Sequence, residues 1–429
     1  MADNKQNTNP NVPNLSFKRE QSEICSDSAE RVINQKQNVP NLRFPEFKEL
    51  WKDSNIGRCF DLYSGNTPSR MEKEHFIGDV NWITSGELKE HYIGDTKERI
   101  SEKAAADNNL RILPIGTFVM AIYGLEAEGV RGTCSITVKT STISQACMAF
   151  TPKSNVSNEF LYSWYKKHGN NIGIRYAQGT KQQNLSYDII EKFPIIYPSI
   201  EEQEKLNTFI SLLDERIATQ NKIIEDLKKL KVAITQKISK DKSNKKVMLS
   251  ELLTERCEKN NDLYPVHSVS VSEGIINQID YLGRSFAAND ISNYNVVYYG
   301  DIVYTKSPTG DFPYGIVKMN SINAKVSVSP LYGVYHPSSE YVGIYLHNYF
   351  SNSLNAKNYL HKLIQKGAKN TINITNKRFL ENEISLPNEA LLKEYSLFIS
   401  TFDLKIKSEQ KALLLLQKQK EYLLQQMFI

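Results

Sequence analysis

The chain repeats one phrase at long range. "FISLLDERI" at residues 209–217 returns as "FISTFDLKI" at residues 398–406, an offset of 189 positions. Internal repeats are considered first, because overlooking one gives the wrong fold for the whole chain. At the same offset Pro198 falls on Pro387 and Gln236 falls on Gln425, so the repeat extends well beyond the phrase itself.

Both copies have heptad spacing. Positions that recur at alternating steps of four and three are apolar at the same eight places and polar at the same two, Gln220 and Lys231 in the first copy and Glu409 and Lys420 in the second. Two unrelated amphipathic helices would not share these polar positions, so we expect helices that pack on each other, with the polar positions fixing the register. The predicted helix-packing residues are Leu206, Ile210, Leu213, Ile217, Ile224, Leu227, Ile399, Phe402, Ile406, Leu413, Leu416 and Leu423.

The start of each helix is also marked. Ser199 with Glu202 three positions later has the form of a capping box after Pro198, and Asn388 is a second N-cap after Pro387. Each helix should then run for about 40 residues, or roughly 60 Å.

The segments that precede the two helices are doubled more faintly. Short runs rich in Val, Ile, Thr and Tyr predict strands in both halves. They include "TFVMAIY" at 117–123, "CSITVK" at 134–139, "DIVYT" at 301–305, "GIVKM" at 315–319 and "KVSVSPLYGVY" at 325–335. We therefore predict an α+β chain with an N-terminal tail at 1–40, a globular domain at 41–198, a helix at 199–240, a second domain at 241–387 and a second helix at 388–429.

The order domain, helix, domain, helix constrains the geometry. If the helices pack along their length, the first must leave the first domain and the second must return, so the pair is antiparallel with a pseudo-twofold axis. Ile429 is then expected near the start of the first domain, around Trp51. A rod of fixed length with a different reading domain at each end would impose a fixed spacing on two DNA contacts, whose half-sites lie about 34 Å apart per helical turn.

Composition and cysteine spacing bear on the class of protein and on its compartment. The chain has 429 residues, of which 40% are hydrophobic, which is ordinary for a globular protein. Its net charge of +5 favours an anionic partner only weakly. No apolar run reaches the roughly 20 residues that span a bilayer, so we expect no membrane association. Five scattered cysteines without a CxxC fit a reducing cytoplasm, where we place the protein.

Catalytic motifs are largely absent from the sequence. There is no GxGxxG after a strand, no GxxxxGK[ST], no HExxH and no GxSxG, and no Cys/His spacing suggests a metal site. The paired-proline tetrapeptides of adenine methyltransferases are missing too. We therefore expect a non-enzyme with no metal.

Candidate nucleic-acid contacts lie in polar loops that combine amide, hydroxyl, cationic and aromatic side chains. Amides can bond adenine, and cations can bond guanine or phosphate. The loops at 178–184 and 366–371 recur at matching places in the two halves, which favours them over the others. The candidates are Thr67, Ser69, Arg70, Ser85, Lys89, Tyr123, Arg131, Tyr176, Gln178, Thr180, Lys181, Gln182, Gln183, Asn184, Arg284, Lys306, Thr309, Lys366, Lys369, Asn370 and Thr371.

These residues resemble a known family. "IGRCFDLYSGNTPSR" followed by "GDVNWITSGEL", and "GTKQQNLSYDIIEKFPIIYPSIEEQEKL" leading into the first helix, resemble the specificity (S) subunit of type I restriction–modification systems. The resemblance covers about residues 48–429. The second half departs from the pattern, since "KRFLENEISLPNEALLKEYS" has no counterpart of the Glu202–Gln203 pair.

The resemblance implies a non-catalytic DNA-binding subunit. Each domain would read one half of a bipartite, asymmetric site in double-stranded DNA, and the helices would set the spacer and dock two methyltransferase (M) subunits. S-adenosylmethionine would belong to the M subunits, which flip and methylate adenine. Two restriction (R) subunits, with ATP and Mg, could join. Two alternatives stay open: a coiled-coil scaffold that binds only proteins, and a stand-alone DNA-modifying enzyme.

Overall fold

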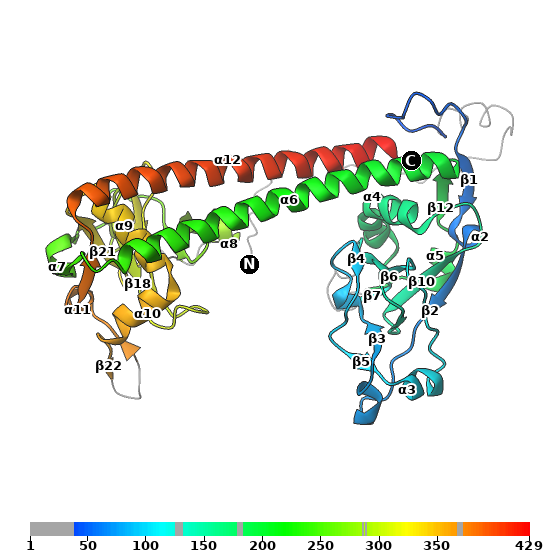
Figure 1. Ribbon diagram of the computed structural model, residues 1–429, viewed down its shortest axis with the longest axis horizontal. Helices are drawn as coiled ribbons and strands as arrows, with labels where there is room; N and C mark the ends of the chain where they lie inside the picture. The colour runs from blue at the N-terminus through cyan, green and yellow to red at the C-terminus, as the bar shows by residue number, and fades with distance from the viewer. Residues whose placement is uncertain (1–37, 125–131, 178–182, 285–286, 288–289, 367–371) are drawn as a thin grey trace, which may run out of the picture. The chain divides into compact units, whose positions relative to one another are not determined.

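The computed structural model describes residues 38–124, 132–177, 183–284, 287, 290–366 and 372–429 (Figure 1). The chain forms two compact units. Unit 1 comprises residues 1–213 and 418–429, and unit 2 comprises residues 214–417. The division falls inside the two long helices, α6 (Ile200–Ser239) and α12 (Glu389–Met427), so each unit contains part of both. The predicted domain limits, which treat the helices as separate segments, stay a prediction.

Unit 1 is a mixed α/β body. Its five-stranded sheet has the order β2-β10-β6-β8-β4, and a three-stranded sheet has the order β5-β3-β9. The elements are β1 (Lys52–Asn55), α2 (Ile56–Cys59), β2 (Phe60–Ser64), η1 (Lys73–Phe76), β3 (Val80–Ile83), η2 (Ser85–Glu87), β4 (Tyr92–Ile93), β5 (Arg99–Ile100), α3 (Glu102–Asp107), β6 (Phe118–Ala121), β7 (Tyr123–Gly124), β8 (Cys134–Thr137), β9 (Ser141–Ile143), β10 (Cys147–Pro152), α4 (Asn158–Tyr176), β11 (Gln183–Asn184), α5 (Tyr187–Ile190) and β12 (Pro194–Tyr197).

Unit 2 is built in the same style. Its four-stranded sheet has the order β14-β21-β18-β19. The elements are β13 (Lys245–Met248), α7 (Leu249–Leu252), β14 (Leu253–Glu255), β15 (His267–Ser270), β16 (Gly274–Asn277), α8 (Gln278–Leu282), β17 (Asn295–Val297), β18 (Ile302–Thr305), β19 (Ile316–Met319), β20 (Val326–Val328), β21 (Gly333–Pro337), α9 (Glu340–Ser351), α10 (Ser353–His361), β22 (Gln365–Lys366), β23 (Ile372–Asn373), α11 (Asn376–Phe379) and β24 (Glu383–Leu386).

The central strand of each unit is buried on both faces. In β6, Phe118 and Met120 join the core that includes α4, while Val119 and Ala121 pack on the opposite side of the sheet. Alternation is expected, because successive strand residues point to opposite faces. In unit 2, β18 behaves alike: Ile302 and Tyr304 join the core beneath α9, and Val303 faces a second cluster. The predicted strand at 325–335 is two strands, β20 and β21, separated by a turn.

The two long helices run in opposite directions within each unit. In unit 1, Leu206 near the start of α6 shares a core with Leu423 and Met427 at the end of α12. In unit 2, Thr235 near the end of α6 bonds Tyr395 near the start of α12, with their hydroxyl oxygens 2.8 Å apart. The expectation of an α+β chain with two mixed units and a pair of antiparallel helices is confirmed.

The C-terminus lies in the core of unit 1. The ring of Phe160 contacts Trp51 at 5.9 Å and Phe428 at 5.3 Å between centroids, so the start of the first domain and the end of α12 meet across one side chain. Trp51 and Phe428 are each 2% exposed. This is the neighbourhood predicted for Ile429.

A short N-terminal segment holds both long helices in unit 1. We call residues 38–46 the clasp. The Leu42 amide donates to the Gln426 carbonyl of α12 at 2.9 Å, and Arg43 forms two hydrogen bonds, of 2.8 and 2.7 Å, with Glu202 of α6. Phe44 meets Phe209 edge to face at 5.9 Å. Residues 38–40, predicted as part of the tail, therefore belong to the fold, and Pro40 is buried.

Candidate nucleic-acid interface

The favoured loop of unit 1 is anchored by a two-stranded ladder. In this ladder Gln183 pairs with Gly124 and Asn184 with Tyr123, antiparallel. Gly124, which precedes residues 125–131, therefore lies beside Gln183, which follows residues 178–182. Of the predicted contacts, Arg131, Gln178, Thr180, Lys181 and Gln182 lie outside the described residues, and Asn184 is exposed.

The matching loop of unit 2 is anchored differently. Here β22 and β23 form a hairpin in which Gln365 pairs with Asn373 and Lys366 with Ile372. Lys369, Asn370 and Thr371 lie outside the described residues. Both favoured loops thus adjoin a two-stranded ladder, but the partner strand is local in unit 2 and distant in sequence in unit 1.

Arg70 has partners within unit 1. Its guanidinium forms a bidentate pair with Glu98, at 2.5 and 2.8 Å, and lies 4.6 Å above the Phe76 ring and 5.4 Å from that of Trp82. The pair raises the pKa of Arg70 and lowers the pKa of Glu98. Both side chains stay partly exposed, so a phosphate would compete with Glu98 for this arginine.

The other predicted contacts of unit 1 lie in local turns. The Thr67 amide bonds Asn66 Oδ1 at 2.8 Å, and Ser69 Oγ accepts from the Met71 amide at 3.4 Å. Ser85 opens η2, whose capping box joins Thr84 and Glu87. Lys89 is exposed just after it.

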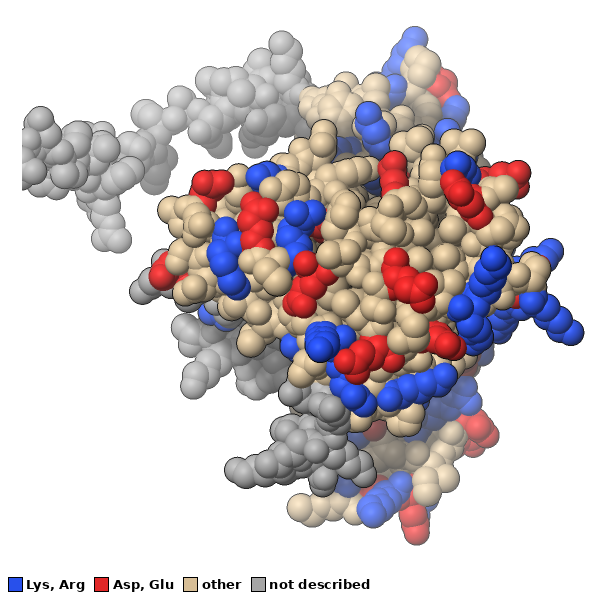
Figure 2. Space-filling model, turned by 90° about the vertical axis from the view of Figure 1, so that its left-hand side faces the viewer, with Lys and Arg blue, Asp and Glu red and all other residues tan. Residues whose placement is uncertain are grey.

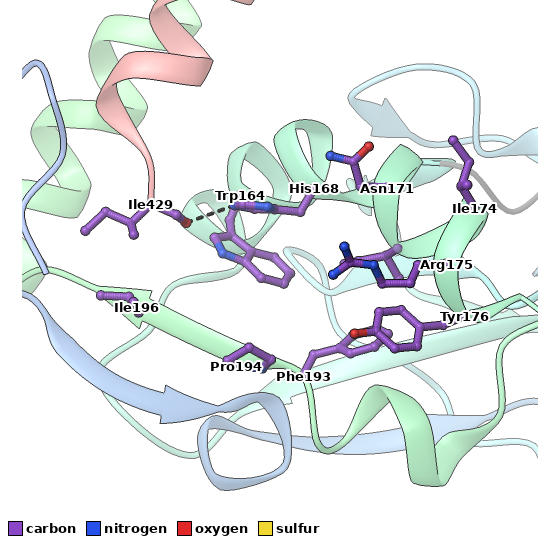
Figure 3. A pocket seen from close by; sticks show the side chains of 11 residues that line it. Trp164, His168, Asn171, Ile174, Arg175, Tyr176, Phe193, Pro194, Ile196 and Ile429 are labelled. Atoms are coloured by element: carbon purple, nitrogen blue, oxygen red, sulfur yellow. Dashed lines mark hydrogen bonds between the residues drawn. The ribbon is translucent and has the colours of Figure 1, made fainter. Parts of the chain in front are cut away.

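A cavity of about 580 Å³ lies beside the C-terminal half of α4 (Figure 3). It is lined by the second half of α4, including Tyr176 and Arg175, by Phe193 of the segment before β12, and by Ile429. Figure 3 shows Arg175, Tyr176 and Phe193 on one side of the cavity and Trp164 with His168 on the other. His168 Nε2 lies 2.8 Å from the Ile429 carbonyl oxygen, and burial lowers the pKa of His168. The predicted contact Tyr176 is thus 40% exposed at the rim of a mostly apolar cavity.

The remaining contacts predicted in unit 2 are dispersed. Lys306 follows β18, and burial lowers its pKa. Thr309 is exposed in the turn where its amide bonds the Phe312 carbonyl at 3.1 Å. Arg284 is exposed after α8.

The predicted helix-packing residues all lie on the inner side of the helices. Leu206, Ile210, Ile224, Ile399, Ile406 and Leu423 are buried, and the others are half-buried. Gln220 Nε2 donates to the Glu409 carbonyl at 3.2 Å and to its carboxylate, joining the two predicted polar positions. Lys231, the other predicted polar position of α6, bonds Asp403 of α12 at 2.6 Å.

Sequence reasoning singled out Glu202 and Gln203 but missed Arg43 and the contacts that fix the junction of unit 1. Arg43 and Glu202 form an ion pair in which the carboxylate is 1% exposed. Gln203 is fully buried: its Oε1 accepts from the Ser157 amide at 2.9 Å, and its Nε2 donates to the Asn155 and Pro198 carbonyls. The expected capping box is half formed, since the Glu202 amide reaches Ser199 Oγ at 3.4 Å while the Glu202 side chain binds Arg43. The available signal was the Glu202–Gln203 pair itself, which has no counterpart in the second half.

On the face in Figure 2, acidic and basic side chains are interspersed, with Lys and Arg gathering along one side.

Among the described residues no cluster of three or more His, Cys, Asp or Glu side chains could hold a metal ion. Within the same residues no helix is both long and apolar enough to cross a membrane.

Comparisons with known proteins show what part of the chain resembles other sequences. Residues 48–229 match the model of the type I restriction modification DNA specificity domain. The type I restriction enzyme MjaIX specificity subunit of Methanocaldococcus jannaschii is 30% identical over 197 residues, which are 43% of this chain and 44% of that protein. The match therefore spans less than half the length of the curated relative.

Two solved structures share the fold over most of the chain. The S subunit of a type I restriction-modification system from M. genitalium has a TM-score of 0.52 at 14% identity, covering 91% of this chain and 99% of that chain. A chain from a study of complex assembly and conformational transition of the type I R-M system has a TM-score of 0.53 at 12% identity, covering 87% and 96%. Residues 48–229 are therefore similar to the type I restriction modification DNA specificity domain, and the chain shares its fold with the solved S subunit of such a system.

Proposed function

We propose that this chain is the non-catalytic subunit that selects the DNA sequence for a type I restriction–modification complex. Each unit would read one half of a bipartite, asymmetric site in double-stranded DNA. The observation that carries the proposal is that both units have the same order of elements. In each unit, a sheet whose central strand is buried on both faces is followed by a loop next to a two-stranded ladder, and then by a long helix. Two differently sequenced loops on one repeated frame suit two different half-sites.

The long helices have two roles in this proposal. They set the length of the unread spacer, and they dock two M subunits. The M subunits would supply S-adenosylmethionine and transfer its methyl group to adenine N6, and R subunits would add ATP- and Mg-dependent cleavage. The chain itself supplies positioning only: amide and cationic side chains of the loops bond base edges and phosphates.

The experiment is DNA binding by the assembled S–M complex over a range of salt concentrations. Phosphate contacts predict that log K falls linearly with log salt, with a slope of about −0.9 per neutralised phosphate. The matched control is the M subunit alone on the same DNA. A slope near zero, or sequence preference in the M subunit without this chain, would contradict the proposal and favour a protein-binding scaffold. Methylation or cleavage by the purified chain alone would favour the enzyme alternative.

A further inference from the structure

The clasp motif occurs twice in the sequence. "NVPNLSF" at residues 11–17 and "NVPNLRF" at residues 38–44 differ only at Ser16 and Arg43. The second copy is part of the clasp, and the first lies outside the described residues. A second copy of a segment that has a built binding site raises the question of a second site.

The site of the second copy is defined by three kinds of contact in unit 1. The Leu42 amide donates to the Gln426 carbonyl in the last turn of α12. Carbonyls in the last turn of a helix lack intrahelical partners, so a passing amide can use them. The Arg43 guanidinium pairs with Glu202, and the Phe44 ring covers Phe209.

The 189-residue repeat gives each residue of this site a corresponding residue in unit 2. Phe209 corresponds to Phe398, and Gln426 corresponds to Lys237, which lies in the last turn of α6. Phe398 is 45% exposed, and the neighbouring Leu397 is 74% exposed. The aromatic side chain that the clasp covers in unit 1 is therefore present in unit 2, where its ring packs against Phe402 at 4.7 Å between centroids and the rest of it is exposed.

One difference between the two sites matches the one difference between the two copies. Glu202, the partner of Arg43, corresponds to Leu391 in unit 2. The first copy has Ser16 where the second has Arg43. A cation opposite Leu391 would lose water without gaining an ion pair, whereas a serine carries no charge to desolvate. The first copy therefore lacks the cation, and unit 2 lacks the carboxylate that would pair with it.

We propose that residues 11–17 are a second clasp, which binds unit 2 of the same chain at the surface around Phe398. Phe17 would cover Phe398, and the Leu15 amide would donate to the Lys237 carbonyl. The 20 residues between the copies can extend to about 66 Å, and a tethered segment has an effective concentration far above that of a second chain. The surface is thus assigned to this chain's own N-terminal segment.

Photo-crosslinking of the full chain tests the assignment. A benzophenone amino acid is placed at position 17, and the cross-linked peptides are identified by mass spectrometry. We expect cross-links to the segments that contain Leu391, Phe398 and Lys237. The matched control carries the same group at position 44, where cross-links to the segments that contain Phe209 and Gln426 are expected. Phe398→Ala, at a partly exposed position, should lower the position-17 cross-link yield about tenfold, because the aromatic contact is lost.

Each other outcome overturns the proposal. Cross-links from position 17 to the Phe209 segment would mean that the first copy competes for the site in unit 1. Mixed products from a mixture of isotope-labelled and unlabelled chains would assign the segment to a second copy of the protein. A position-44 control that works while position 17 gives no cross-link would show that the first copy binds neither unit. None of these results depends on DNA, so the proposed function is tested separately.

Discussion

Gln203 shows how two copies of one frame use different chemistry at the same place. In unit 1 its amide is fully buried and joins Ser157, Asn155 and Pro198. The 189-residue repeat places Leu392 at this position in unit 2, where it is 4% exposed in the apolar core. The polar junction of unit 1 is therefore sensitive to the loss of a single side chain, because its partners would stay buried without a bond.

Gln203→Ala should destabilise unit 1 by about 1–3 kcal/mol, the cost of leaving buried polar groups unpaired. The measurement is the urea midpoint of the unit 1 transition, and the control is the exposed neighbour in Glu204→Ala. Equal effects of the two substitutions would contradict the role assigned to the buried amide.

Lys318 predicts a pH dependence of unit 2. The side chain is 6% exposed on β19, its Nζ lies 3.3 Å from Ser351 Oγ, and burial, aided by Lys231, lowers the pKa of Lys318 to about 8. Between about pH 8 and the ordinary lysine value near 10.4, the unfolded chain binds more protons at this site. The free energy of unfolding therefore rises with pH across that window, and below pH 8 the folded state carries the full cost.

Lys318→Met should raise the free energy of unfolding of unit 2 near pH 7 by about 2–3 kcal/mol and remove this rise. Urea unfolding at a series of pH values checks it. Lys357→Met, at an exposed position of α10, is the control and should change little. A destabilised Lys318→Met chain would show that the ammonium is needed.

The favoured loop of unit 1 supplies a prediction for DNA binding by the S–M complex. Lys181→Ala should weaken binding to all sequences alike if Lys181 contacts phosphate. Gln182→Ala should relax the choice at one base pair, by about 1–3 kcal/mol. Affinities on the cognate site and on single-base variants separate the two roles. Equal losses on every sequence from both substitutions would contradict them.

At the scale of elements, the sequence predicted the helices better than the sheets. Heptad spacing is a local signal, and the predicted seam lies on the inner side of both α6 and α12. Strand partners are not local: β7 pairs with β11 across about 60 positions, while β22 pairs with its neighbour, although the loops they carry resemble each other. Pairing of this kind depends on tertiary packing, which no short pattern contains.

The clasp shows a second limit of sequence reasoning. "NVPNLRF" is polar and aperiodic, which favours a tail, yet Arg43 and Phe44 find partners on α6. The ion pair joins residues 159 positions apart. Only the folded core brings Glu202 to a place where an arginine can reach it.

The paired helices predict how length changes act. Removing one heptad from α6 alone should destabilise the helix pair, because the seam of α12 then faces shifted positions. A matched deletion in α12 should restore stability and shorten the DNA spacer that the complex tolerates. Thermal unfolding and binding to sites of graded spacer length check the two parts. An unchanged spacer after the matched deletion would contradict the role of the helices in setting it.

At the scale of the whole molecule, the two halves of the chain share one frame and differ in detail. The family model covers residues 48–229, which hold the first globular domain and most of α6, while the shared fold extends over 91% of the chain. The second half keeps the order of elements and the helix-packing residues. It differs in having Leu392 at the position of Gln203 and in pairing β22 with its neighbour β23. Two frames with different loops are what an asymmetric, two-part target requires.

The most direct measurement maps N6-methyladenine in cells that express the S–M complex, first with this chain and then with residues 245–386 replaced by the equivalent domain of another S subunit. We predict methylation at a two-part site with an unread spacer, and a change in one half of that site after the replacement. A change in both halves, or in neither, would contradict the claim that each unit reads its own half.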